Sequence, residues 1–216
     1  MLIKVVSNLL LEGIGNNISS YGFKFNKSKK LFERNQGGFI HIIDFIFLKE
    51  DAGIFIEPLI KIKCLEIEAI YHKVTTKESK YNDATITLGN SIFKIIDFAD
   101  NNTEIDTDKQ QYYLVEEEKD ISILIKVITD KIIDYAIPYF EQNSSIDRID
   151  LLLNKNPKEI SVHNWLYPMR ACIGLISAKL NANPNYSELL EVYSMEMQEA
   201  AESYKKEFLI LRKLLG

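Results

Sequence analysis

The spacing of hydrophobic and polar positions changes along the chain and separates a strand-rich first half from a helical second half. Residues 3 to 20 repeat apolar side chains near helical spacing, and Gly22 follows, as expected just after a helix C-terminus. Four strand-like segments come next, separated by polar or glycine-containing turns. These segments are residues 23 to 27, 31 to 35, 39 to 48 and 54 to 63. The pattern predicts a helix followed by an antiparallel meander.

Residues 39 to 48, FIHIIDFIFL, are the most apolar of these segments, with eight large hydrophobic side chains. A strand with two apolar faces needs a cover on each face, so this segment predicts a three-layer arrangement or a sheet curved strongly around a helix. His41 and Asp44 are its two polar side chains. Their separation by three residues places them on opposite faces of a strand. We expect each to be a buried polar group with a hydrogen-bond partner.

The remaining pattern changes from mixed to helical. Residues 65 to 74 fit a short helix, although alternation at their start leaves a strand open as the alternative. Further along, strands are predicted at residues 84 to 98, an acidic loop at 99 to 111 and a last strand at 112 to 117. Helices are then predicted at residues 120 to 136, 144 to 153, 168 to 181 and 185 to 215. Pro138 is expected to end the first of these helices.

The predicted helix at residues 185 to 215 is unusually long for a chain of this size. About 30 residues make about 45 Å of helix, and its apolar stripe needs a surface along that whole length. The helix at 168 to 181 would cover part of the stripe. The rest packs on the chain's own core or against a second copy, so a homodimer through the C-terminal helix is the alternative to core packing.

Together these elements predict an α+β protein with an N-terminal helix, an antiparallel sheet of about five strands and a helical C-terminal half packed on it. Residues 1 to 118 would hold the first helix and the sheet, and residues 119 to 216 the helical region. We expect the two regions to form one continuous globular unit, because 216 residues suffice for one sizeable core.

Composition excludes several classes of protein. Apolar content of 46% and charged content of 26% are ordinary for a soluble globular protein, and the net charge is −5. The 26 Lys and Arg are scattered, which argues against a nucleic-acid partner. No apolar run reaches the length of about 20 residues that spans a membrane, so no membrane partner is predicted. Cys64 and Cys172 lie far apart without a paired spacing, which favours free thiols and a cytoplasmic location.

Metal chemistry has little support in the sequence. Cys64, Glu68 and His72 recur every four residues and would share one helix face. The outer two would be about 12 Å apart along the axis, too far to meet on one ion, so only Glu68 with His72 remains as a candidate metal pair. The acidic loop does not fit a calcium-binding loop, because Ile105 and Gln111 stand where Gly and Glu are needed. No cofactor is predicted.

Four residues are candidates for a binding site. Arg34, His41 and Tyr113 would share one face of the predicted sheet, and Trp165 would close a cleft between the sheet and the helices. A Trp exposed at this position would itself be a candidate contact.

The segment YGFKFNKSKKLFERNQGGFIHIIDFIF resembles the start of an uncharacterised bacterial family, domain of unknown function 4304. The resemblance rests on Gly22, Phe23 and Lys24, then on Phe32, Glu33 and Arg34, then on the long apolar strand. The later segment YYLVEEEKDISILIKVITDKIIDYAIPYFEQNSSIDRIDLLL is also similar. The resemblance covers about residues 1 to 155 and implies an α+β fold in a bacterial cytoplasm. It implies no activity and carries no catalytic motif.

The sequence contains no nucleophile–base set, ligand cluster or phosphate-binding loop. A non-enzymatic binding or interaction protein is therefore the favoured hypothesis, with an unknown protein partner. A toxin-immunity partner, whose carboxylates mask a basic nuclease surface, is one form of it. The alternative is an enzyme or small-ligand binder whose site is assembled between sheet and helices.

Overall fold

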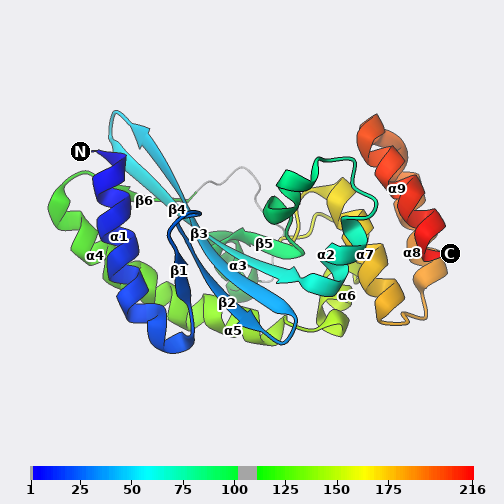
Figure 1. The fold of residues 1–216 in the computed structure, drawn as a ribbon, viewed down its shortest axis with the longest axis horizontal. Helices are drawn as coiled ribbons and strands as arrows, with labels where there is room; N and C mark the ends of the chain where they lie inside the picture. The colour runs from blue at the N-terminus through cyan, green and yellow to red at the C-terminus, as the bar shows by residue number, and fades with distance from the viewer. Residues whose placement is uncertain (1, 102–110) are drawn as a thin grey trace. The chain divides into compact units, whose positions relative to one another are not determined.

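The computed structural model describes residues 2–101 and 111–216, and it confirms the α+β class. A helix opens the chain, strands follow, and the C-terminal half is helical (Figure 1). Among the described residues the sheet has six strands, in the order β1-β2-β3-β4-β5, with β6 also paired to β4. The sequence prediction of a helix, an antiparallel sheet and a helical second half is thus confirmed.

The chain forms two compact units. The sheet unit comprises Met1–Lys61 and Asn90–Glu141, and the helical unit comprises Ile62–Gly89 and Gln142–Gly216. Each unit therefore contains segments from both halves of the sequence. The boundary expected near residue 118 lies inside the sheet unit.

The sheet unit is built from one N-terminal helix, a meander of strands and a helical layer. Its elements are α1 (Ile3–Ile18), η1 (Ser19–Tyr21), β1 (Lys24–Asn26), β2 (Leu31–Gln36), β3 (Phe39–Glu50), β4 (Gly53–Cys64), β5 (Leu88–Ser91), α3 (Ile92–Asn101), β6 (Tyr113–Val115), α4 (Glu118–Lys131), η3 (Ile132–Ala136) and α5 (Ile137–Gln142). Two of these strands, β4 and β5, also contribute residues to the helical unit. Gly22 ends the first helical segment with a left-handed φ of 84°, a conformation that glycine adopts without strain.

The helical unit packs around α7. Its elements are α2 (Leu65–Tyr71), η2 (Ser79–Ala84), α6 (Ile146–Asn154), α7 (Tyr167–Leu180), α8 (Tyr186–Glu196), η4 (Met197–Glu199) and α9 (Glu202–Leu215). Helix α7 contacts α2, α6, α8 and α9, and every residue from Arg170 to Ala178 is buried. A helix enclosed on all sides needs an apolar or small side chain at nearly every position, which the sequence ACIGLISA supplies. No helix of the described residues has both the length and the apolar character needed to cross a membrane.

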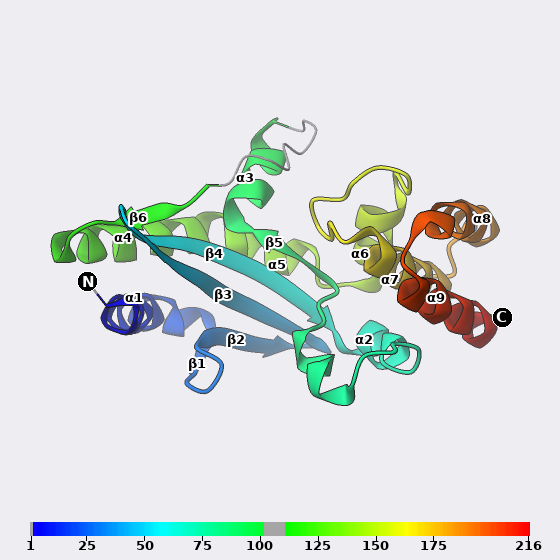
Figure 2. The ribbon, with the colours of Figure 1, turned by 90° about the horizontal axis from the view of Figure 1, so that it is seen from above.

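One face of the sheet is covered by helices. Cross-strand partners share a face, so Phe32 lies beside Ile43, and Arg34 beside His41. On this face the ring of Phe140 from α5 stacks on His41 at 4.8 Å. An added Cβ on Gly15 of α1 would come within 2.9 Å of the Phe32 ring, so the helix lies close against the strand. Helices α1, α4 and α5 form this covering layer (Figure 2).

The other face of β3 corrects the expectation that both faces are covered. His41, Ile43 and Phe45 are buried, but on the opposite face Ile46 and Leu48 are each 47% exposed. One face of β3 is therefore covered, whereas the opposite face is buried at Ile42 and open over the second half of the strand. Asp44 lies on this open face and binds Lys61 at 2.6 Å, so it has the partner expected for it.

Pro138 does not end the helix predicted at residues 120 to 136. The helix runs on through the π-helical turn η3 into α5, which contains Pro138 and ends at Gln142. A proline ring clashes with the carbonyl four residues before it in a regular α-helix. The wider π-turn just before Pro138 provides room for the ring, so the helix continues.

The strand prediction for residues 84 to 98 is wrong after Ser91. Only Leu88–Ser91 forms a strand, and Ile92–Asn101 forms α3. In IFKIIDF the apolar side chains fit helical spacing as well as a strand, and Ile92, Ile95 and Ile96 are buried. Of the predicted loop at 99 to 111, residues 102–110 lie outside the described residues, and residues 99–101 are helical.

The single long helix predicted at residues 185 to 215 is also wrong. The chain forms α8, then the 3₁₀ turn η4, then two extended alanines, and then α9. The expected 45 Å stripe is therefore divided between two shorter helices. Leu189 and Tyr193 of α8, Met197 of η4, and Phe208 and Leu211 of α9 are buried, so part of the apolar stripe faces the core of the helical unit.

Candidate functional site

Arg34 and His41, two of the predicted binding residues, lie side by side on the covered face of the sheet. Arg34 Nε donates to His41 Nδ1 at 3.1 Å, and the guanidinium also contacts Tyr21 O at 3.3 Å and the Phe23 ring at 4.9 Å. His41 has no exposed surface. Burial, together with the Arg34 charge, lowers the pKa of His41 to about 4, so the ring is neutral and accepts the hydrogen bond. The pair contacts α5 through the stacking of Phe140 on His41 and through an ion pair between Arg34 and Glu141 at 3.7 Å. His41 is fully buried, whereas the Arg34 side chain is 12% exposed.

Tyr113 shares that covered face, as the sequence predicted. Tyr113 pairs with Ile56 of β4. Ile56 is one of the buried residues of β4, and these lie on the face of the sheet opposite the Asp44–Lys61 ion pair. The Tyr113 ring packs on Phe93 of α3 at 4.9 Å, and burial raises the pKa of its hydroxyl. These are packing contacts within the sheet unit.

Trp165, the fourth predicted binding residue, belongs to the helical unit and is 66% exposed. The four residues before it form a tight turn closed by a bridge between Ser161 and Asn164, and all four are buried. Asn164 Nδ2 donates to Thr87 O at 3.2 Å and anchors that turn. Ile160, on the other side of the turn, is 60% exposed. Trp165 is therefore an exposed aromatic side chain on a fixed turn, as expected of a contact residue.

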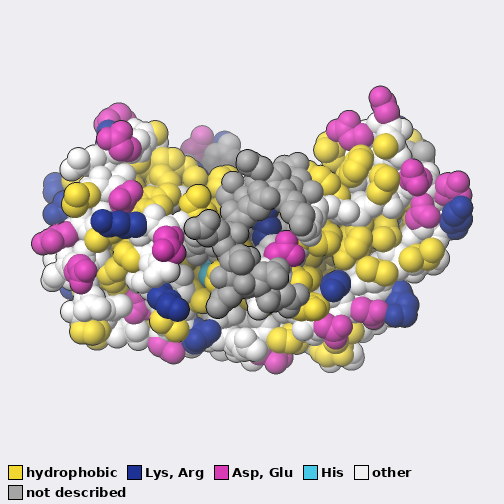
Figure 3. All heavy atoms as spheres, turned by 180° about the vertical axis from the view of Figure 1, so that it is seen from behind, with side chains coloured by type: hydrophobic (Ala, Val, Ile, Leu, Met, Phe, Trp, Pro, Cys, Tyr) yellow, Lys and Arg dark blue, Asp and Glu magenta, His cyan; other side chains and the backbone are white. Residues whose placement is uncertain are grey.

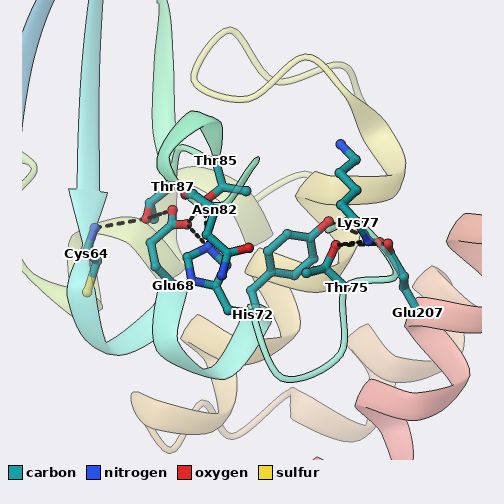
Figure 4. Close-up of polar contacts among 10 residues, drawn as sticks. Cys64, Glu68, His72, Thr75, Lys77, Asn82, Thr85, Thr87 and Glu207 are labelled. Atoms are coloured by element: carbon teal, nitrogen blue, oxygen red, sulfur yellow. Dashed lines mark hydrogen bonds and ion pairs between the residues drawn. The ribbon is translucent and has the colours of Figure 1, made fainter. Parts of the chain in front are cut away.

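The candidate metal residues Glu68 and His72 form a polar cluster with two threonines (Figure 4). Thr85 Oγ1 donates to Glu68 Oε2, and Thr87 Oγ1 donates to Glu68 Oε1 at 2.9 Å. His72 Nε2 lies 3.3 Å from Glu68 Oε2 and 2.7 Å from Thr85 Oγ1. In the described parts of the chain, no three His, Cys, Asp or Glu side chains are arranged to hold a metal ion. The cluster satisfies a buried carboxylate and joins α2 to the segment before β5.

Sequence reasoning missed a second buried carboxylate, Glu207 of α9, which is 1% exposed. It accepts hydrogen bonds from Tyr71 Oη at 3.1 Å, Thr75 Oγ1 at 3.0 Å, Thr76 N at 2.7 Å and Thr76 Oγ1 at 2.9 Å. We call these donors, Tyr71 at the end of α2 with Thr75 and Thr76 after it, the carboxylate nest. Figure 4 shows Glu207 with Thr75 of this nest. A glutamate inside a helix stripe that is otherwise apolar was the sequence signal for it.

The open face of the sheet is an exposed apolar feature that the sequence did not identify as a site. It combines the outward positions of β3, β4 and β6, where Phe55 is paired with Leu114 and packs against the Tyr112 ring at 5.6 Å. We define the open face by five apolar side chains on this side of the strands, which are Ile46, Leu48, Phe55, Tyr112 and Leu114. The Asp44–Lys61 ion pair lies on the same side of the sheet. Ile46 and Leu48 are the most exposed of them, and the other three are half-buried.

Carboxylates gather at the end of the sheet where the β3–β4 hairpin turns. Val115 of β6 pairs with Ile54, which brings the residues after β6 next to the hairpin tip. Asp120 fixes that turn by accepting the backbone N–H groups of Glu116 at 3.0 Å and Glu117 at 2.8 Å. We call the exposed carboxylates here the acidic rim, which consists of Glu50, Asp51, Glu116, Glu117 and Glu118.

Two exposed lysines, Lys49 and Lys119, lie in the same stretches, and Lys119 is paired with Glu117 at 2.6 Å. Carboxylates therefore predominate at the rim. Figure 3 shows the hairpin arm with carboxylates toward its tip and hydrophobic side chains below them. The arrangement is an apolar surface bordered on one end by negative charge.

No family model, no curated protein and no solved structure matches this chain. The resemblance to domain of unknown function 4304 thus stays a prediction.

Proposed function

We propose that the chain is a non-enzymatic binding protein and that the open face is its docking surface for a basic protein. The observation that carries the proposal is the open face itself, an apolar surface where Ile46 and Leu48 remain exposed among the described residues of the sheet unit. Exposed contiguous apolar surface on an ordered scaffold is typical of interaction sites. The complete burial of His41 favours this proposal over a catalytic site on the covered face.

The side chains of the open face suit protein recognition. Phe55 and Tyr112 provide large aromatic area, and both are already held by packing against each other, so binding would cost little side-chain entropy. Ile46 and Leu48 would supply the surface that loses most water on binding.

The acidic rim indicates the sign of the partner's charge. Carboxylates beside an apolar contact attract a basic surface, accelerate association and disfavour acidic competitors. The net charge of −5 acts in the same direction. Because the rim is exposed, its contribution would weaken as salt is added, since the Debye length falls to about 3 Å at 1 M.

A more specific form of the proposal is that the partner is a nuclease toxin and that the chain masks its basic nucleic-acid-binding surface. A nuclease must present positive charge to its substrate, and the acidic rim is complementary to such a surface. Adding the chain in equimolar amount to the purified partner would then abolish nuclease activity. Undiminished activity in a confirmed complex would reject the toxin-immunity form and leave the binding proposal intact.

The binding proposal is tested with matched surface variants. Ile46→Lys and Leu48→Lys place charge on the open face, whereas Ile123→Lys changes a 60% exposed residue of α4 in the covering layer. All three are exposed changes expected to alter stability by less than about 1 kcal/mol. The immobilised wild-type chain and the three variants are incubated with lysate of the source organism, and retained proteins are identified by mass spectrometry.

We expect one basic protein retained in stoichiometric amount by the wild type and by Ile123→Lys, lost by the two open-face variants and released by salt. Retention that is equal for all four chains, or an acidic protein as the specific partner, would contradict the proposal. Recovery of no stoichiometric partner would also contradict it.

A further inference from the structure

The break between α8 and α9 has no local cause in the sequence. Residues 186 to 215 contain neither glycine nor proline. The break itself has the sequence MQEAA, and Met, Gln, Glu and Ala are all good helix formers. Ala201 occupies the N-cap of α9 and makes no capping hydrogen bond, although alanine is among the poorest N-cap residues. On local preference alone, residues 186 to 215 would form one helix.

Tertiary contacts therefore hold the break. Glu207 is enclosed by the carboxylate nest, and Phe208 and Leu211 are 3% and 0% exposed in the helical unit. Between the helices, Ala200 and Ala201 are extended, with ψ of 160° and 150°. Local preference and packing favour different backbones at these residues, which marks the break as a hinge.

We propose that α8 and α9 can straighten into one helix, and that two copies of the chain then exchange α9. Glu207 of each copy docks into the carboxylate nest of the other. Exchange recreates the contacts that α9 makes with α7 and with the carboxylate nest, so the two forms differ chiefly at the hinge, where α9 contacts η4 in the closed chain, and in the cost of association. The hinge residues gain helical hydrogen bonds on straightening, which favours the exchanged dimer at high concentration.

Variants at the hinge separate the two forms, whereas variants in the nest would weaken both equally. Ala201 has φ −62°, which proline requires, and Ala200 has the extended backbone that precedes proline. Ala201→Pro is therefore compatible with the closed chain and incompatible with a straight helix. Ala201→Gln is the matched control, because position 201 is exposed and glutamine is accepted in either form.

The chains are partly unfolded in urea at high concentration and refolded by dialysis, and their mass is measured by light scattering after size exclusion. We expect dimers from the wild type and Ala201→Gln, and a dimer fraction about 100-fold smaller for Ala201→Pro, the effect of a proline inside a helix. Hydrogen exchange of the isolated wild-type dimer should show protected amides at residues 198 to 201 that are unprotected in the monomer.

Four results would overturn the proposal. The first two are a wild-type chain that stays monomeric throughout and an Ala201→Pro chain that dimerises as the wild type does. The third is a dimer that Leu209→Lys abolishes, because Leu209 is 54% exposed on the outer side of α9 and its loss would indicate a surface dimer instead. The fourth is a wild-type dimer whose amides at residues 198 to 201 are unprotected, a result that does not depend on the folding of the proline variant.

Discussion

At the scale of single residues, the buried ring of His41 links the fold to pH. In the folded chain the pKa of His41 is about 4, below the value of about 6.5 in an unfolded chain. The unfolded state therefore binds more protons between these two values. His41 contributes stability that is fully present above pH 6.5 and is lost as the pH falls toward 4.

We expect this loss to amount to about 2–3 kcal/mol of unfolding free energy between pH 7 and pH 4. Replacing His41 with Gln should remove that part of the pH dependence while keeping a hydrogen-bond acceptor for Arg34. Urea denaturation of the two chains at several pH values gives the difference curve. Parallel curves for the wild type and His41→Gln would show that the ring is not held neutral by burial.

Arg170 is a second buried residue whose role can be measured. Its guanidinium donates to Leu153 O and Asn156 O, each at 2.8 Å, and to Glu159 O, and the residue is 2% exposed. These carbonyls lie at the end of α6 and in the segment leading to Trp165. Arg170 thus donates hydrogen bonds to backbone carbonyls at the C-terminal end of α6 and in the segment after it.

Arg170→Met should lower the free energy of unfolding by about 3 kcal/mol, because several buried carbonyls lose their donor. Lys155→Met, an exposed change in the same unit, should stay within about 0.5 kcal/mol of the wild type. Chemical denaturation monitored by Trp165, the single tryptophan, measures both. Equal stability of the two variants would mean that water replaces the guanidinium without cost.

At the scale of elements, the β3–β4 hairpin depends on one glycine. Gly53 has φ 146°, and a Cβ there would come within 2.5 Å of Val115 O in β6. Gly37, in the β2–β3 turn, has φ 56° and open space around it. Both glycines have a positive φ, but only at Gly53 would an added Cβ meet neighbouring atoms.

Gly37→Ala should cost about 1 kcal/mol from backbone strain alone, and Gly53→Ala about 3 kcal/mol because β6 must also shift. Thermal unfolding compares the two directly. If both variants lose the same stability, β6 does not lie as tightly against the hairpin as the register indicates. Gly53→Ala should also displace the acidic rim, which follows β6.

The sequence predicted those elements whose apolar period is unambiguous. Helix α1, strands β1 to β4 and helix α7 lie within a few residues of their expected positions. The prediction of a strand at residues 92 to 98 was wrong because the apolar side chains of IIDF fit both helical and strand spacing. Ile92, Ile95 and Ile96 are buried together, which is the spacing of one helix face. The break between α8 and α9 could not be predicted, because we attribute it to the docking of Glu207 against Tyr71 and its neighbours, which are distant in the sequence.

At the scale of the whole molecule, the sequence predicted which side chains share a sheet face but not what covers that face. It predicted that Arg34, His41 and Tyr113 share a sheet face, and the structure agrees, yet helices cover that face. The apolar stretch at residues 39 to 48 was expected to be enclosed on both faces. Which face a helix covers depends on connections between distant elements, and no periodicity within one strand records it.

The central claim is that the open face binds a basic protein, and affinity of the isolated partner is its most direct measurement. Titration calorimetry would compare the wild type with Ile46→Lys and Ile123→Lys at one fixed salt concentration. We expect at least about 100-fold weaker binding for Ile46→Lys, as for a charge buried at an interface centre, and less than about threefold for Ile123→Lys. Equal affinities for all three chains would contradict the claim.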